Sequence, residues 1–219
     1  MFQNKNYNNI FSDSHFLTSI FLIAACLILS AVFPSGSAIQ KFTGQIFFLV
    51  AVPAAYIKFI LKKNLSDFGL NIKNVKSGLF WGVLAVAVIL SSTYLAIRYT
   101  AFADSYSLPG YIVDNFWYFL LYELVFANIS ILCFEFFMRG FVLFTFFSKI
   151  ARWSILVQAL LYLIFMIFYK NNFEQIIYGS ALSIILGFVT LKTRSIVYSY
   201  AIILISSLIV DAYLIYSIK

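Results

Sequence analysis

Residues 133–141 read Cys-Phe-Glu-Phe-Phe-Met-Arg-Gly-Phe, an apolar stretch that holds one carboxylate, Glu135, and one guanidinium, Arg139. On a helix, side chains four residues apart lie on one face, so these two charges can meet. Residues 126–148 contain no other full charge. A charge at membrane depth is costly and is kept either for function or in a tight pair. The stretch therefore predicts a buried polar centre inside an apolar helix.

The composition indicates a membrane protein. Of the 219 residues, 63% are hydrophobic and 11% are charged, and the mean hydropathy is +0.96. A soluble domain carries about 25% charged residues and lacks repeated apolar runs long enough to cross a bilayer. We therefore expect an all-α polytopic transmembrane bundle of about seven to eight helices.

The apolar runs divide the chain into a polar N-terminal segment, residues 1–15, and a single transmembrane domain, residues 16–219. The N-terminal segment lacks the pattern of a cleaved signal peptide. Pro53 lies inside the second run and predicts a kink there. The fourth run would be about 60 Å long as one straight helix, so an interfacial or re-entrant eighth helix is the alternative. We expect seven crossings, at residues 16–33, 42–61, 77–97, 111–150, 153–168, 173–191 and 196–218.

The basic residues predict the orientation of the chain. The formal net charge is +7, and the lysines and arginines fall mostly at the ends of the runs. If residues 111–150 cross once, ten basic residues lie on the side of the N-terminus and four on the other side. Cytoplasmic loops carry the excess of lysine and arginine, so we expect a multi-pass protein with a cytoplasmic N-terminus. The charge thus reflects topology, and we predict no nucleic-acid partner.

A polar stripe follows one face of the fourth run. Asn128, Glu135 and Arg139 fall within a narrow sector at 100° per residue, and such a stripe must face protein or a water-filled cavity. Two interpretations stay open, namely an ion pair that orients helices and a catalytic carboxylate. The only histidine, His15, precedes the first run, which places the usual catalytic partner far from the stripe.

No metal or cofactor site is predicted from the remaining residues. The two cysteines, Cys26 and Cys133, lie in apolar runs without the spacing of a zinc site, so we expect two small buried side chains. A transporter-like bundle is disfavoured because no pair of broken helices recurs in related halves.

The stripe carries a resemblance to a known family over roughly residues 60–215. The segment from Phe134 to Gly140 resembles the first motif, E-E-x-x-x-R-G, of the CAAX prenyl endopeptidase and bacteriocin-processing family of intramembrane proteases. Glu135, Arg139 and Gly140 match that motif, whereas Phe134 stands where the family has its first glutamate.

Two further motif positions depart from the family. Residues 165–169 resemble the F-x-x-x-H motif, with Tyr169 in place of the histidine. The H-x-x-x-N or D motif of the last span would fall at residues 203–207, with Ile203 in place of the histidine. Upstream, Asn64–Leu70 also resembles the approach to the family's core.

The resemblance implies two functions. In active members the glutamates activate water, and the histidines and amide stabilise the oxyanion. With these positions replaced, we expect a degenerate member that binds a membrane protein, a peptide or a membrane lipid in the former active-site cavity, as an immunity, scaffold or regulatory subunit. The alternative is an active endopeptidase with Glu135 as base, Tyr169 as donor and Arg139 as electrostatic support. The family implies a prokaryotic plasma membrane. The expected cavity residues are Asn128, Phe134, Ile203, Ser207 and Asp211.

Overall fold

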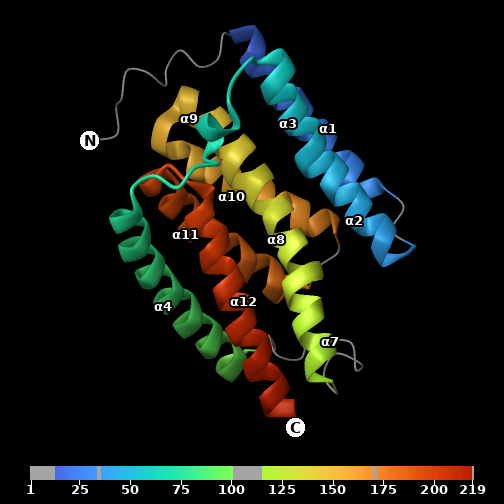
Figure 1. Ribbon diagram of the computed structural model, residues 1–219, viewed down its shortest axis with the longest axis vertical. Helices are drawn as coiled ribbons and strands as arrows, with labels where there is room; N and C mark the ends of the chain where they lie inside the picture. The colour runs from blue at the N-terminus through green and yellow to red at the C-terminus, as the bar shows by residue number, and fades with distance from the viewer. Residues whose placement is uncertain (1–12, 34–35, 101–114, 170–171, 219) are drawn as a thin grey trace.

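The computed structural model describes residues 13–33, 36–100, 115–169 and 172–218, and every regular element in these ranges is helical (Figure 1). The all-α fold class is therefore confirmed. Most of the polar N-terminal segment, and the connection that holds Asp104, lie outside the described residues. The α-helices are α1 (Asp13–Val32), α2 (Ala38–Ile46), α3 (Val52–Ala55), α4 (Val75–Tyr99), α7 (Phe116–Leu121), α8 (Asn128–Phe134), α9 (Leu143–Ile150), α10 (Ser154–Phe168), α11 (Phe173–Thr193) and α12 (Ile196–Ile218).

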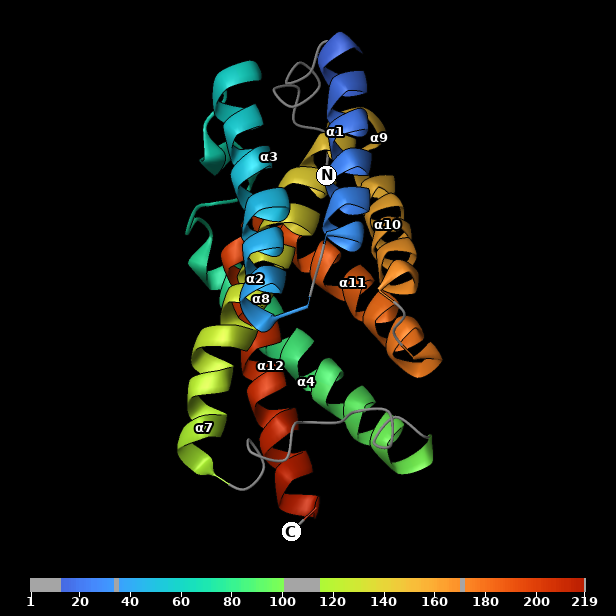
Figure 2. The same ribbon diagram turned by 90° about the vertical axis from the view of Figure 1, so that its right-hand side faces the viewer.

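Six described segments are long and apolar enough to cross a membrane. The longest, Phe116–Phe168, has 53 residues and joins two of the seven expected crossings. It turns at Ala151, whose φ is +49°, and α10 then packs against α9 (Figure 2). The difference between six and seven segments therefore lies in one tight turn that interrupts an otherwise continuous apolar run.

Stretches of π-helix recur in two of the membrane-spanning segments, Ile39–Ile60 and Phe116–Phe168. The π-helical stretches are η1 (Phe47–Ala51), η2 (Tyr56–Ile60), η4 (Tyr122–Ala127) and η5 (Glu135–Val142). The N–H of Val52 bonds to the carbonyl of Phe47, five residues back. Since η1 and η2 lie on either side of Pro53, the chain accommodates this proline with π-helical turns, a recognised way of inserting an irregularity into a helix.

The core centres on η5. Its residues are all buried, and Phe137, Met138 and Phe141 have no exposed surface. The 3-10 turn η3 (Leu65–Phe68) brings Phe68 against Phe141, with their ring centroids 6.2 Å apart. A Cβ placed on Gly140 would lie only 3.1 Å from the carbonyl oxygen of Phe68. The close approach of the Phe68 backbone therefore gives a packing reason for glycine at position 140.

The segment after η3 ties this turn to α12. Gly69 has a φ of +89°, a conformation that favours glycine, and its carbonyl accepts a hydrogen bond of 2.9 Å from the N–H of Ile196. The loop from residue 64 to residue 70 is thus docked on η5 and on the first residue of α12.

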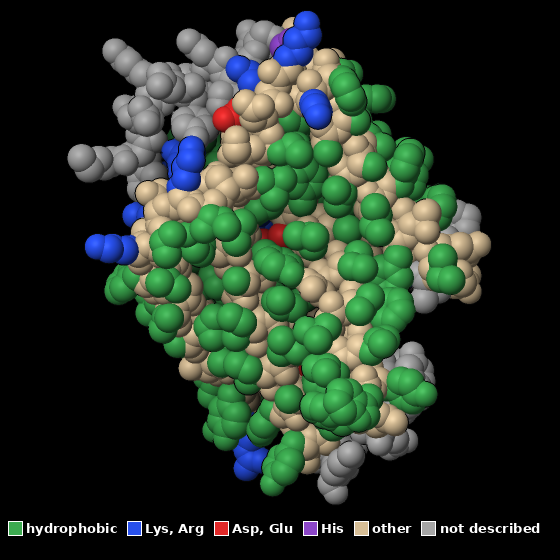
Figure 3. Space-filling model, viewed as in Figure 1, with side chains coloured by type: hydrophobic (Ala, Val, Ile, Leu, Met, Phe, Trp, Pro, Cys, Tyr) green, Lys and Arg blue, Asp and Glu red, His purple; other side chains and the backbone are tan. Residues whose placement is uncertain are grey.

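The outer surface is that of a multi-pass membrane protein. Large apolar side chains cover the face in Figure 3, and lysine and arginine side chains gather mainly toward its upper end. Apolar side chains exposed on this scale require an apolar solvent, which a bilayer supplies.

Candidate functional site

Glu135 and Arg139 form a buried ion pair at the first turn of η5. Arg139 Nη1 lies 3.2 Å from Glu135 Oε1, and the two residues are 3% and 2% exposed. Both positions face inward because η5 is covered by α10, α11 and α12. The predicted pairing of the two motif charges is therefore present in the structure.

Polar groups from α10 and α11 complete the surroundings of Arg139. Its Nη2 donates to Ser183 Oγ at 3.4 Å, and Gln158 Nε2 donates to the same oxygen at 2.6 Å. The guanidinium also lies over the ring of Tyr162, with 5.5 Å between Cζ and the ring centroid. The position of Arg139 is therefore fixed by contacts with Glu135, Ser183 and Tyr162.

The network is incompletely satisfied. Glu135 Oε2, Arg139 Nε and Gln158 Oε1 are buried and have no hydrogen-bond partner among the described residues. A buried polar atom without a partner costs free energy, and it is commonly found where water or a ligand binds. Glu135 Oε2 is the atom of this group that could act on a water.

Two adjoining cavities lie beside the ion pair. The smaller, of about 160 Å³, is lined by Glu135, Arg139 and Tyr162 among others. The larger, of about 420 Å³, lies between α2, α8, α10 and α12. Ser130, Ile131, Phe134 and Ile203 line both cavities.

A second pair of buried acids lines the larger cavity. Glu123, in η4, is 0% exposed, and Asp211, in α12, is 3% exposed. Their carboxylates interact electrostatically. Two neighbouring carboxyl groups therefore lie on one wall of this cavity, which Lys41 also lines.

A row of aromatic rings includes two of the motif positions, Phe134 and Tyr169. The ring of Phe134 packs edge-on against Phe165 at 5.2 Å, and Phe165 lies 4.5 Å from the ring of Tyr169. The hydroxyl of Tyr169 donates to the carbonyl of Ser30, in α1, at 3.0 Å. Tyr169 is thus engaged with α1 and lines the larger cavity, whereas Tyr162 is the tyrosine that lines the cavity of Glu135.

The structure brings most of the predicted cavity residues together. Phe134 and Ile203 line both cavities, and Ser207 and Asp211 line the larger one. Asn128 is not among the lining residues of either. Its amide donates to the carbonyl of Leu124 at 3.1 Å and accepts a hydrogen bond from Tyr200.

Several residues of the site escaped prediction from the sequence. Glu123 was not among the expected cavity residues, yet it lines the cavity that adjoins the ion pair. Gln158 and Ser183 were not singled out, although a polar side chain in an apolar run was the available signal. His15 lies at the start of α1, where its carbonyl accepts from Ser19 at 2.7 Å. Within the described ranges, no group of three or more histidine, cysteine or acidic residues could hold a metal ion.

The comparisons with known proteins agree with the motif. Residues 112–209 match the family model described as type II CAAX prenyl endopeptidase Rce1-like. No curated protein and no solved structure matches the chain. The matched range is shorter than the resemblance expected at residues 60–215, but it holds all three motif positions, from Glu135 through Tyr169 to Ile203. Residues 112–209 are therefore similar to the Rce1-like type II CAAX prenyl endopeptidases.

Proposed function

We propose that this protein is a catalytically degenerate member of its family, which binds a membrane partner in the two adjoining cavities instead of cleaving it. The observation that carries the proposal is the state of the three motif positions. Glu135 is paired with Arg139 at 3.2 Å, and the side chains of Phe134 and Ile203 form apolar walls.

Hydrolysis by a carboxylate needs a water beside the base and donors aimed at the developing oxyanion. The loss of one such donor costs about a hundredfold or more in rate elsewhere. Here Ile203 stands in place of one family histidine and Tyr169 in place of the other. The hydroxyl of Tyr169 donates a hydrogen bond to the carbonyl of Ser30 and is therefore not available as an oxyanion donor. The remaining side chains can form the ion pair and can bind a partner in the cavities.

The larger cavity favours a partner that carries a positive charge. Two acidic residues, Glu123 and Asp211, line it against one basic residue, Lys41. The rings of Phe42 and Phe126, whose centroids lie 5.2 Å apart, line the same cavity. A carboxylate beside aromatic faces attracts an ammonium or guanidinium group. A membrane-embedded peptide or protein segment with one lysine or arginine at depth fits this chemistry, and an immunity, scaffold or regulatory role would follow from such binding.

The alternative function is an active endopeptidase. One observation favours it, namely that Glu135 lines the smaller cavity and that its Oε2 has no hydrogen-bond partner in the described part of the chain. This oxygen could accept a proton from a water.

Cleavage assays separate the two functions. The protein reconstituted in lipid is incubated with prenylated and unprenylated peptides that end in a CAAX sequence, alongside Glu135→Gln. The expected result is no cleavage above the level of that variant. Cleavage by the natural sequence that Glu135→Gln abolishes would overturn the degenerate assignment.

Partner binding is tested by filling the cavity. Ser207 lines the larger cavity, and its hydroxyl donates to the carbonyl of Leu204 in its own helix. Ser207→Phe should abolish co-purification of a stoichiometric membrane partner. Ser92→Phe is the matched control, because Ser92 makes the same kind of bond to Ile89 and lies outside both cavities. Equal retention of the partner by both variants would argue against binding in the cavity.

A further inference from the structure

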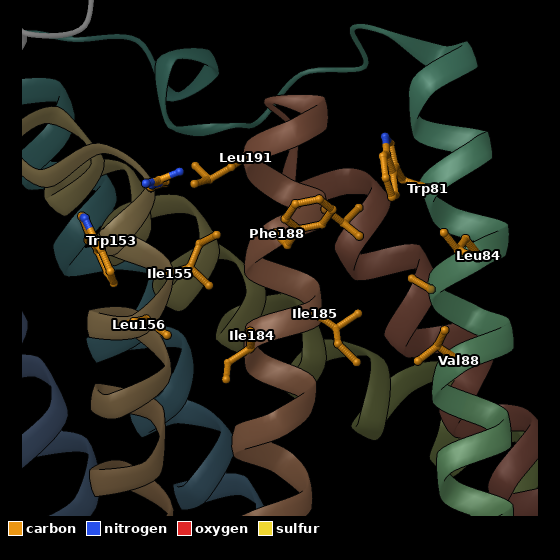
Figure 4. A pocket seen from close by; sticks show the side chains of 13 residues that line it. Trp81, Leu84, Val88, Trp153, Ile155, Leu156, Ile184, Ile185, Phe188 and Leu191 are labelled. Carbon is orange, nitrogen blue, oxygen red and sulfur yellow. The ribbon is translucent and has the colours of Figure 1, made fainter. Parts of the chain in front are cut away.

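A separate groove of about 640 Å³ lies between α4, α10 and α11 (Figure 4). Trp81, Leu84 and Val88 come from α4, and Leu156 and Ile184 come from α10 and α11. None of its lining residues lines the two cavities beside Glu135. The groove is therefore a different site from the one proposed above.

One end of the groove is aromatic and basic. Trp81 and Trp153 stand on opposite walls near this end (Figure 4). Arg152 lines the groove, with its Cζ 5.9 Å from the ring of Trp153. Across the groove, Lys192 Nζ lies 5.7 Å from the ring of Trp81 and 5.5 Å from that of Phe188. Positive charge thus flanks the groove on both walls at the same end.

The other end is aliphatic and open to the bilayer. Val88, Leu156 and Ile184 form the walls there (Figure 4). Leu156 is 49% exposed, and Val88 is 47% exposed. No acidic side chain is among the residues that line the groove. An occupant can therefore enter from the surrounding lipid, and it must be apolar at one end and negatively charged at the other.

We infer that this groove binds an anionic phospholipid. Arginine and lysine recognise phosphate through charge-assisted hydrogen bonds, and tryptophan prefers the headgroup level of a membrane. The phosphate would lie between Arg152 and Lys192, and an acyl chain would follow Val88 and Ile184 toward the middle of the bilayer. Clusters of basic residues near a membrane surface select anionic lipids in this way.

Tryptophan fluorescence offers a direct test. The chain has three tryptophans, Trp81, Trp117 and Trp153, and only Trp117 lies outside the groove. The Trp117→Phe protein is reconstituted in phosphatidylcholine vesicles that contain rising fractions of brominated phosphatidylglycerol or of brominated phosphatidylcholine. Bromine quenches tryptophan at contact. We expect brominated phosphatidylglycerol to reach half-maximal quenching at a mole fraction about fivefold to tenfold lower.

Variants of Arg152 and Lys192 test whether these two charges cause the preference for phosphatidylglycerol. In the Trp117→Phe background, Arg152→Gln with Lys192→Gln should remove the preference and leave quenching by brominated phosphatidylcholine unchanged, which also reports an intact groove. Lys149→Gln is the matched control, since Lys149 precedes Arg152 by three residues but does not line the groove, and its Nζ lies over Phe16, 5.7 Å from the ring centroid. Equal quenching by the two lipids in the starting protein would overturn the inference, as would an equal loss of preference in Lys149→Gln.

Discussion

The pair of Glu135 and Arg139 shows why one carboxylate and one guanidinium persist in an apolar helix. Each ion alone would be strongly destabilising at this depth, and pairing offsets much of that cost. The pair keeps two unpartnered atoms, Glu135 Oε2 and Arg139 Nε, so it is not an optimised structural bridge. Under the proposed degenerate function, the pair would be retained from a catalytic site because neither member can be lost alone.

Removing one member of the pair should therefore destabilise the fold. Arg139→Leu leaves the Glu135 carboxylate unpaired and deprives Ser183 of a donor, so we expect a loss of about 3–5 kcal/mol in the free energy of unfolding. Thermal unfolding in detergent measures this loss. The double variant Glu135→Leu with Arg139→Leu should recover most of it, because no buried charge then remains. An unchanged melting temperature in Arg139→Leu would show that the pair is not buried in this way.

The glycine of the motif makes a second prediction at the same scale. In Gly140→Ala the new Cβ would lie 3.1 Å from the backbone oxygen of Phe68, so the docked loop must shift. We expect a loss of about 1–3 kcal/mol by thermal unfolding. Gly82→Ala is the control, because its Cβ would have its nearest neighbour at 4.0 Å. Alanine at that helical position should stabilise by about 0.5–1 kcal/mol. Equal effects at the two positions would argue against the close approach of the loop.

At the scale of the element, the long helix from residue 116 to residue 150 explains what the sequence could and could not predict. Spacing alone paired Glu135 with Arg139, because four residues bring side chains together in either kind of turn. On a regular α-helix, at 100° per residue, Glu123 would lie about 120° from Glu135 and so on another face. The π-helical stretch η4 holds more residues per turn and changes the register between Glu123 and Glu135. No residue pattern in this stretch signals that change. The contact of Glu123 with α12 is also a tertiary contact that helical periodicity does not encode.

Glu123, in η4, and Asp211, in α12, are neighbouring buried acids, so we expect that removing one of them stabilises the fold but weakens binding of the partner. Glu123→Gln removes one of two neighbouring buried carboxyl groups, and we expect the free energy of unfolding to rise by roughly 1 kcal/mol. Co-purification of the cationic partner should weaken in the same variant. Glu174→Gln is the control, because Glu174 lies in the first turn of α11, where the helix dipole favours negative charge. It should not raise stability. A destabilised Glu123→Gln protein would mean that this carboxylate serves the fold and not a ligand.

At the scale of the whole molecule, the composition predicted the helical fold, and the positions of the basic residues predicted that they gather at one end. The helical fold followed from the apolar runs, and only the turn at Ala151 changed the number of segments. The gathering of lysine and arginine at one end, which Figure 3 shows, also follows from the sequence. The side of the membrane that this end faces is a prediction that the fold alone does not test.

The two ends of α4 provide that test. Lys76 lies in the first turn of this helix, at the basic end, and Thr100 follows its last residue at the other end; both are exposed. The natural cysteines, Cys26 and Cys133, are buried, so they contribute little labelling. Because basic ends stay in the cytoplasm, a membrane-impermeant maleimide should label Thr100→Cys in intact cells and Lys76→Cys only after permeabilisation. The opposite labelling would invert the predicted orientation. It would also place the basic end of the lipid groove at the outer leaflet, where the surface potential that concentrates anionic lipids at the cytoplasmic leaflet is absent.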